Sequence, residues 1–335
     1  EITIQTESLV KAYDGIALTS QGWIISAGQL LNGHRIEYVM TSSITNPGTI
    51  NNNISVVIYD QNNQVVTQGY DINYDLGRLT VEPINLDIST ETNQKVYDGV
   101  ALTSSVWTII NGTLLANHRI EAVMVSSITL PGQTENQIDI HIYDGQNLEV
   151  TSMYNVRLYE GTLTVLPIEI TIQTESLVKA YDGIALTSQG WIISAGQLLN
   201  GHRIEYVMTS SITNPGTINN NISVVIYDQN NQVVTQGYDI NYDLGRLTVE
   251  PINLDISTET NQKVYDGVAL TSSVWTIING TLLANHRIEA VMVSSITLPG
   301  QTENQIDIHI YDGQNLEVTS MYNVRLYEGT LTVLP

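Results

Sequence analysis

An internal repeat constrains this chain more than any other feature. The segment that begins Glu1-Ile2-Thr3-Ile4 returns unchanged at Glu169, and every residue from there to Pro335 matches the residue 168 positions earlier. A second period of 84 lies inside this unit, because Tyr13-Asp14-Gly15 recurs as Tyr97-Asp98-Gly99. Periods of this kind indicate a tandem array of similar structural units. We therefore expect four modules in the order A-B-A-B, over residues 1–83, 84–167, 168–251 and 252–335.

The local residue pattern predicts β-strands almost throughout. Ile138, Ile140 and Ile142 alternate with polar residues, which is the period of a half-buried strand. Turn-forming residues such as Asn46-Pro47-Gly48 separate the strand-like runs. We expect a mostly β fold of four β-grasp-like or β-sandwich-like modules, each with about six or seven short strands. The one stretch that would suit a helical turn is 27–32, which is too short for an independent helix.

The module boundaries contain no flexible linker. One module closes on Leu79-Thr80-Val81-Glu82-Pro83, and the next opens directly on Ile84-Asn85-Leu86. Proline fixes its own φ and favours an extended conformation of the residue before it. We therefore expect semi-rigid joints and four modules arranged end to end as a rod.

Composition argues against several classes of function. The chain has no cysteine, so neither disulfides nor thiolate metal sites help to hold the modules together. It has 12 Lys and Arg against 34 Asp and Glu, and the resulting net charge of −22 argues against nucleic acid as a partner. Apolar runs are too short to span a membrane, and no signal peptide is recognised. We expect a soluble interior segment or a mature form without membrane contact.

The order of short motifs resembles a known family of repeats. Each module carries Lys-x-Tyr-Asp-Gly, Ala-Leu-Thr-Ser, Gly-x-Leu-Leu-x-x-His-Arg, Ser-Ser-Ile-Thr-x-Pro-Gly and a closing Gly-x-Leu-Thr-Val-x-Pro. This order is similar to the YDG or MBG domains of bacterial surface proteins, and the match covers each module entirely. The resemblance implies β-grasp-like domains stacked into the stalk of a secreted or cell-wall-anchored protein, and hence an extracellular location. Module A departs from the usual Tyr-Asn step, because Tyr70 is followed by Asp71, whereas Tyr154 of module B is followed by Asn155.

The motif residues have a structural interpretation. The Asp-Gly pairs of Tyr13-Asp14-Gly15 and Tyr97-Asp98-Gly99 predict turns, with each tyrosine ring buried. Trp23 and Trp107 occupy the same position in modules that differ at about half of their residues, which favours a place in the core. The alternative is that these tryptophans form an exposed platform that binds a ligand.

The single lysine of each module has two interpretations. Lys11 and Lys95 stand two residues before Tyr-Asp-Gly, as do Lys179 and Lys263 in the second copies. A lysine whose stem covers an aromatic ring, while its ammonium stays in water or pairs with an acid, is the favoured interpretation. The alternative is an isopeptide crosslink, which some bacterial stalk domains form, to an asparagine of a late strand such as Asn73 or Asn155.

Catalytic and metal-binding patterns are not recognised. His34 and His118 belong to different modules, and His141 has no second histidine at ligand spacing. The runs Asp60-Gln61-Asn62-Asn63 and Asp144-Gly145-Gln146-Asn147 lack the acidic pattern of a calcium loop, which favours hairpin turns. No Gly-x-Ser-x-Gly elbow is present. We expect no enzyme activity, no cofactor, and no catalytic, cofactor-binding or metal-ligating residues.

Three functions follow from these observations. The leading one is a non-catalytic stalk or spacer of a bacterial extracellular or cell-wall-anchored surface protein of the adhesin type. The second is direct adhesion to a host glycan or protein through Trp23 or Trp107. The third is a segment of an extracellular filament in which module edges pair between chains.

Overall fold

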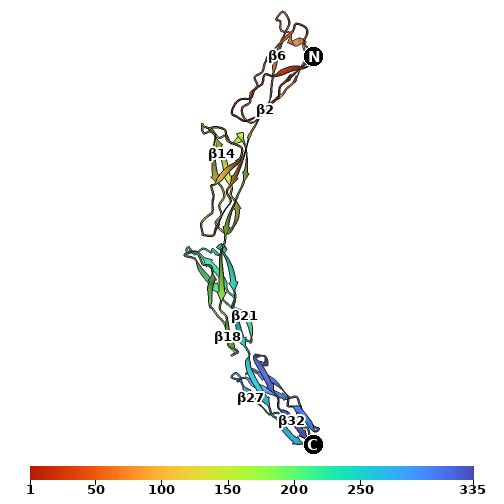
Figure 1. Cartoon of the computed structure of the whole chain (residues 1–335), viewed down its shortest axis with the longest axis vertical. Helices are drawn as coiled ribbons and strands as arrows, with labels where there is room; N and C mark the ends of the chain where they lie inside the picture. The colour runs from red at the N-terminus through yellow and green to blue at the C-terminus, as the bar shows by residue number, and fades with distance from the viewer. The chain divides into compact units, whose positions relative to one another are not determined.

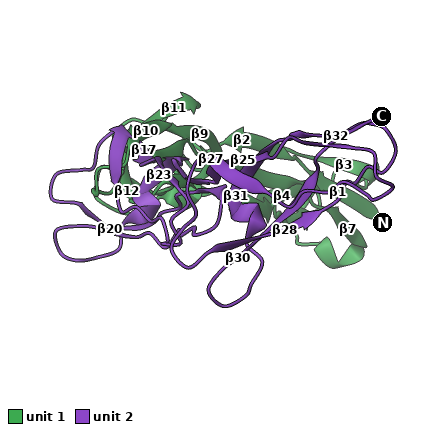
Figure 2. Ribbon diagram, turned by 90° about the horizontal axis from the view of Figure 1, so that it is seen from below, with its two compact units in different colours: residues 1–166 green, residues 167–335 purple.

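Strands make up the regular structure of this chain. The computed structural model describes all residues from Glu1 to Pro335, and it contains strands and four 3₁₀ helices (Figure 1). The chain divides into two compact units, residues 1–166 and residues 167–335 (Figure 2). Each unit contains one A module and one B module. The prediction of a mostly β fold of four repeated modules is confirmed. The rod arrangement and the β-grasp-like or sandwich-like detail stay predictions.

Every module contains eight strands and one 3₁₀ helix in the same order. In the first unit they are β1 (Ile2–Thr6), β2 (Leu9–Ala12), β3 (Trp23–Gly28), β4 (Arg35–Val39), β5 (Gly48–Asn51), β6 (Ser55–Tyr59), η1 (Thr67–Gly69), β7 (Ile72–Asp75), β8 (Arg78–Glu82), then β9 (Ile84–Thr90), β10 (Asn93–Val96), β11 (Trp107–Asn111), β12 (Arg119–Met124), β13 (Gly132–Glu135), β14 (Ile138–Tyr143), η2 (Thr151–Met153), β15 (Tyr154–Tyr159) and β16 (Thr162–Leu166).

The second unit repeats this series. Its elements are β17 (Ile168–Thr174), β18 (Leu177–Ala180), β19 (Trp191–Ala195), β20 (Arg203–Val207), β21 (Gly216–Asn219), β22 (Ser223–Tyr227), η3 (Thr235–Gly237), β23 (Tyr238–Asp243), β24 (Arg246–Glu250), then β25 (Ile252–Thr258), β26 (Asn261–Val264), β27 (Trp275–Asn279), β28 (Arg287–Met292), β29 (Gly300–Glu303), β30 (Ile306–Tyr311), η4 (Thr319–Met321), β31 (Tyr322–Tyr327) and β32 (Thr330–Leu334). No helix of the chain is both long and apolar enough to cross a membrane.

Two sequence-based expectations about these elements are corrected. The predicted number of six or seven strands is too low, because the opening segment breaks at Glu7-Ser8 and its two halves, β1 and β2, join different sheets. The helical turn lies at Thr67–Gly69 and its equivalents, whereas residues 27–32 finish strand β3 and continue into a loop and turn. The break between β1 and β2 is decided by long-range pairing with β7 and β8, which local propensity does not reveal.

Three small sheets make up each module. In the first A module their strand orders are β3-β1-β7, β2-β8-β5 and β4-β6. The sheets are mixed, since β1 runs antiparallel to β3 and parallel to β7, while β8 runs parallel to β2 and antiparallel to β5. Strands β4 and β6 form an antiparallel pair from Arg35 opposite Tyr59 to Val39 opposite Ser55.

The core of each module lies between the inner faces of its sheets. Strand alternation buries Ile2 and Ile4 and turns the residues between them outward. Together with Val56 and Ile58 of β6, they form the core cluster of the first A module. Each of the other three modules has an equivalent cluster of its own. Each module therefore has a main core cluster of its own, and in the last module Leu270, Leu331 and Val333 form a second one.

The opening and closing segments of a module run in the same direction. Ile2 to Gln5 of β1 pair in parallel with residues 72–75 of β7, and residues 9–12 of β2 pair in parallel with residues 79–82 of β8. The chain therefore enters a module at one end of these ladders and leaves it at the other end. Only Pro83 separates the last strand β8 from β9, the first strand of the next module.

A buried polar network connects the strands at the point where the chain passes from β1 to β2. The hydroxyl of Thr6 donates to the carbonyl of Asn52 at 2.8 Å and accepts from the N–H of Gly77 at 2.8 Å. The Asn52 side chain donates to the carbonyl of Glu7 at 3.1 Å. Gly77 is required here because a Cβ at this position would lie 2.4 Å from that same carbonyl oxygen. The repeated glycine of the closing motif is thus explained by a close backbone approach.

Candidate functional site

The Tyr-Asp-Gly motif forms a closed turn. One carboxylate oxygen of Asp14 accepts from the Lys11 ammonium at 2.6 Å and from the N–H of Ile16 at 2.9 Å. Gly15 has a φ of 78°, which glycine adopts without strain. The hydrogen bond from Lys11, with that from the Ile16 backbone, lowers the pKa of Asp14. These contacts form the expected turn, and Asp98-Gly99 repeats the arrangement with Lys95. The ring of Tyr97 is buried as expected, whereas Tyr13 is only half-buried.

The lysines are held within this turn. Lys11 donates to Asp14 and to the carbonyl of Ile16, whereas the side-chain amide of Asn73 donates to Glu1 at 2.9 Å. In module B, Lys95 has the equivalent partners Asp98 and Val100, and the amide of Asn155 donates to Asn85. The structure therefore pairs the lysines with acids and does not bring them to the asparagines that the crosslink interpretation requires.

The same motif also borders the joint between modules A and B. The N–H of Tyr13 donates to the carbonyl of Glu82 at 2.8 Å, immediately before Pro83. In the next module Tyr154, at the start of β15, is only 6% exposed. Burial raises the pKa of Tyr154, and the nearby phenol of Tyr13 raises it further. The motif tyrosine of one module therefore lies close to the tyrosine that begins strand β15 of the following one.

A histidine of the same module is the side-chain partner of this buried tyrosine. The hydroxyl of Tyr154 lies 2.7 Å from Nδ1 of His118 and accepts from the N–H of Leu115 at 3.1 Å. The sequence contained a signal for this pair, because a tyrosine follows the His-Arg histidine by 36 residues in all four modules. Tyr70 and His34 form the same contact in the first module at 2.8 Å.

The tryptophans lie against the core. Trp23 and Trp107 are half-buried, and they pack on the core clusters of modules A and B respectively. Each is paired with a buried threonine, Thr6 or Thr90, so its side chain lies on the inner face of the sheet. This placement supports the core interpretation.

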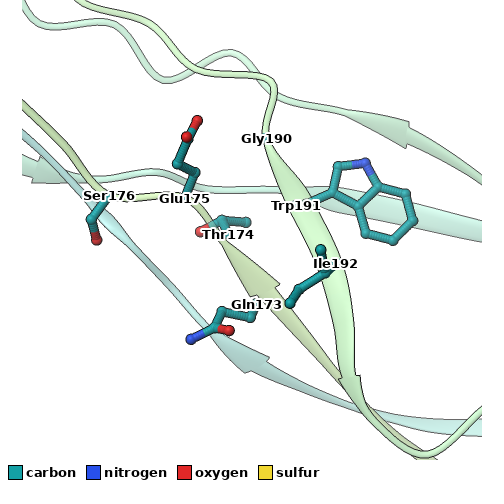
Figure 3. Close-up of a pocket in the computed structure, with 7 residues that line it drawn as sticks. All are labelled: Gln173, Thr174, Glu175, Ser176, Gly190, Trp191 and Ile192. Carbon is teal, nitrogen blue, oxygen red and sulfur yellow. The ribbon is translucent and has the colours of Figure 1, made fainter.

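A shallow groove, lined in part by the tryptophan, lies in each A module. In the second copy it has a volume of about 460 Å³ and is lined by Gln173, Thr174, Glu175, Ser176, Gly190, Trp191 and Ile192 (Figure 3). Gly190 leaves the groove open, because a Cβ there would meet Oε2 of Glu175 at 2.6 Å. That oxygen already accepts from Ser188 at 2.6 Å. Module B has Val106 at the glycine position, and this side chain is 57% exposed.

The outer face of the β4–β6 pair combines exposed valines with one Arg–Glu ion pair in module A. We call this surface the A face and define it by Arg35, Glu37, Val39, Val57 and Val65. Arg35 lies over the ring of Tyr59 at 4.5 Å and pairs with Glu37 at 2.6 Å, which shows that these side chains share one face. Val39 and Val65 are 62% and 63% exposed. The second A module presents the same face with Arg203, Glu205, Val207, Val225 and Val233.

Module B carries charged residues at the equivalent positions. His141 replaces Val57, Glu149 replaces Val65, and Asp139 replaces Ser55. Nδ1 of His141 lies 3.0 Å from Glu149, and Nε2 lies 3.4 Å from Asp139. The hydrogen bond to Glu149, with the charge of Asp139, raises the pKa of His141. The two modules therefore share a fold but differ in the chemistry of this face.

The asparagine-rich runs form hairpin turns. One carboxylate oxygen of Asp60 accepts from the N–H groups of Asn62 and Gln64, both at 2.8 Å, and Asp144 does the same with Gln146 and Leu148. The hairpin interpretation is confirmed. No group of three or more His, Asp or Glu side chains is arranged to hold a metal ion.

Comparisons with known proteins give only remote similarities. No family model matches the chain, and no curated protein matches it. Among solved structures, repeats EC1–4 of the protocadherin PcdhgB3 are 10% identical, with 86% of this chain and 83% of that chain covered and a TM-score of 0.16. Drosophila N-cadherin EC1–4 is 10% identical, with 99% of each chain covered and a TM-score of 0.18. The Bacillus anthracis TIE protein is 10% identical, with 92% and 66% covered and a TM-score of 0.18. These scores do not assign the chain to a fold family.

Proposed function

We propose that this chain is a non-catalytic stalk or spacer segment of a bacterial surface protein. The observation that carries the proposal is the parallel pairing of the opening and closing segments in each module, β1 with β7 and β2 with β8. A chain that enters and leaves at opposite ends of its module adds the length of that module between its neighbours. This is the topology that a spacer requires.

The same pairing resists tension. A pull on both ends of a module loads the parallel ladders along their length, so that the four pairs from Leu9–Leu79 to Ala12–Glu82 bear the load together. An antiparallel hairpin pulled at its open end instead loses its pairs one after another. A module loaded along its ladders must therefore break several hydrogen bonds in one event, which makes forced unfolding slow.

The joint between modules supports the proposal as well. Pro83 is the single residue between β8 and β9, and the N–H of Tyr13 fixes the carbonyl just before it. Tyr13 also lies near the buried Tyr154 of the following module. A short joint with such contacts transmits orientation and load from one module to the next.

The order of motifs supports the biological setting of the proposal. Its resemblance to YDG or MBG repeats favours an extracellular location at a bacterial cell surface and a structural role without catalysis. Direct adhesion through Trp23 or Trp107 has less support, because both side chains pack against the core.

Single-molecule force spectroscopy on the whole chain tests the spacer proposal. Pulling through the two termini is expected to give four unfolding events with equal length increments, since the four modules have nearly equal lengths. Cysteine handles at Val39 and Ser55, which face each other in the antiparallel pair, serve as the control. They should unfold the module at a clearly lower force. Equal forces in the two geometries would contradict a load-bearing role.

A further inference from the structure

We propose that the A faces form a docking surface for a second copy of this chain. The proposal goes beyond a spacer role, since it gives the chain a lateral partner. In each A module the antiparallel pair β4–β6 turns two exposed valines outward, the bridge of Val65 to Tyr59 adds a third, and no other strand pairs with the outer edge of β4. The surface is repeated without change in the second A module, 168 residues further along the chain.

The register of the A face places its three valines on a diagonal across neighbouring strands. Glu37 stands opposite Val57, Val39 stands opposite Ser55, and Val65 stands opposite Tyr59. In module B the side chains equivalent to Val57 and Val65 are in direct contact, because His141 and Glu149 are 3.0 Å apart. Exposed apolar side chains that adjoin in this way mark interaction surfaces when water can be excluded from them.

The charges on the A face fit a second copy of the same surface. Arg35 and Glu37 lie beside the valines with opposite charge, and both are about half-exposed. In a two-fold contact each surface meets its own copy, so Arg35 of one chain can approach Glu37 of the other. A different partner would need a matching pair of charges at the same separation, whereas a second copy always has it.

The equivalent face of module B is unsuited to the same contact. It carries Asp139 and Glu149 around His141, and a two-fold contact would bring four carboxylates together. Like charges held close together without water between them oppose association. Module B therefore limits the contact to the A modules and helps to fix which parts of two chains meet.

The expected association is weak at one face and stronger over the whole chain. Three valines form a patch well below the roughly 800 Å² per partner of a standard interface. Because the second A module repeats the face, each chain carries two such surfaces, which increases the number of contacts that a pair of chains can make. The net charge of −22 opposes the approach of two chains, and salt screens this repulsion.

Sedimentation equilibrium of the whole chain between 0.1 and 1 M NaCl tests the proposal. Self-association should be detectable at high protein concentration and should strengthen as salt rises. The test variant carries Val39→Ser, Val65→Ser, Val207→Ser and Val233→Ser, which keep the net charge unchanged. We expect its dissociation constant to be at least tenfold higher than that of the unmodified chain.

A control variant tests whether association depends on the A face or on exposed valines in general. Val10 and Val178 are 64% and 63% exposed on β2 and β18, away from the A face. The variant with Val10→Ser and Val178→Ser should associate like the unmodified chain. Circular dichroism of both variants checks that the fold is kept. A chain that stays monomeric at 1 M NaCl, or equal weakening by both variants, overturns the proposal.

Module B provides a reciprocal test of the same idea. Replacing its charged cluster by the residues of module A, with His141→Val, Glu149→Val, His309→Val and Glu317→Val, creates two further apolar faces. These residues already occupy the same positions of the same fold in module A, so the variant is expected to fold. Its association should be stronger than that of the unmodified chain. Unchanged or weaker association would contradict the proposal.

Discussion

Single polar residues in the core of each module connect strands that are far apart in the sequence. Thr6 is the clearest case, because its hydroxyl joins the carbonyl of Asn52 to the N–H of Gly77. Thr6 is 4% exposed, so neither group can exchange this partner for water. The threonine position is equivalent in all four modules, where Thr90, Thr174 and Thr258 make the same contacts.

Removing this hydroxyl should destabilise module A. Thr6→Val together with Thr174→Val keeps the side-chain volume but leaves the Gly77 and Gly245 N–H groups without an acceptor. An unsatisfied buried donor costs about 1–3 kcal/mol, and we expect a loss in this range per A module in urea unfolding. The control is Thr49→Val with Thr217→Val, at exposed hydroxyls, which should change stability by less than about 0.5 kcal/mol. Equal effects of the two pairs would contradict this account.

Tryptophan contributes to stability through its contact with the core. Trp107→Ala with Trp275→Ala should destabilise module B by about 3 kcal/mol, at the lower end of the range for large aromatic truncations, because the side chains are only half-buried. The unfolding transition of module B should shift down by several degrees in calorimetry. Val106→Ala with Val274→Ala, at exposed neighbouring positions, should leave it almost unchanged. An unaltered transition in the tryptophan variant would restore the exposed-platform interpretation.

At the scale of elements, the β4–β6 pair and its equivalent β12–β14 show how one fold carries two surfaces. Both pairs have the same register, with Arg35 opposite Tyr59 and Arg119 opposite Tyr143. In module B, Asp139 and Glu149 flank His141, and Glu121 stands opposite it. The hydrogen bond to Glu149 and the charge of Asp139 favour the protonated imidazole, which raises the pKa of His141 in the folded state.

The hairpin of module B should therefore respond to pH in a way that module A does not. A raised folded-state pKa gives a stabilisation that is fully present below the unfolded pKa of about 6.5 and is lost as pH rises through the folded value. Urea unfolding of the whole chain at pH 6 and pH 8 measures this pH-dependent stabilisation. His141→Val with His309→Val should remove the part of the pH dependence assigned to module B. A variant with the same pH dependence as the unmodified chain would contradict the assignment.

At the scale of the whole molecule, the repeat and the charge act together. Each module has its own core, and each unit is compact by itself, so no single large core holds the chain together. The formal charge of −22 is carried by two identical halves. This charge affects association of the whole chain more than the fold of any module.

The charge predicts that the chain does not retain nucleic acid. Binding to duplex DNA requires basic side chains that displace counterions from the phosphates, and the chain has 34 acidic residues against 12 basic ones. A gel-shift assay with duplex DNA at physiological salt should show no retained complex. Saturable retention that weakens as salt rises would contradict this prediction.

The sequence alone determined the fourfold repeat, the β class, the turns and the short joints. These features depend on identity at a fixed period, on alternation within five or six residues, and on local chemistry such as that of Asp14-Gly15 and Pro83. Only the tertiary structure decided which strands pair, that the opening and closing segments run parallel, and that Tyr154 meets His118. It also decided that Val39, Val57 and Val65 share one face. Contacts of this kind join residues that lie tens of positions apart. Their energies depend on the strand register, which cannot be deduced from the local residue pattern.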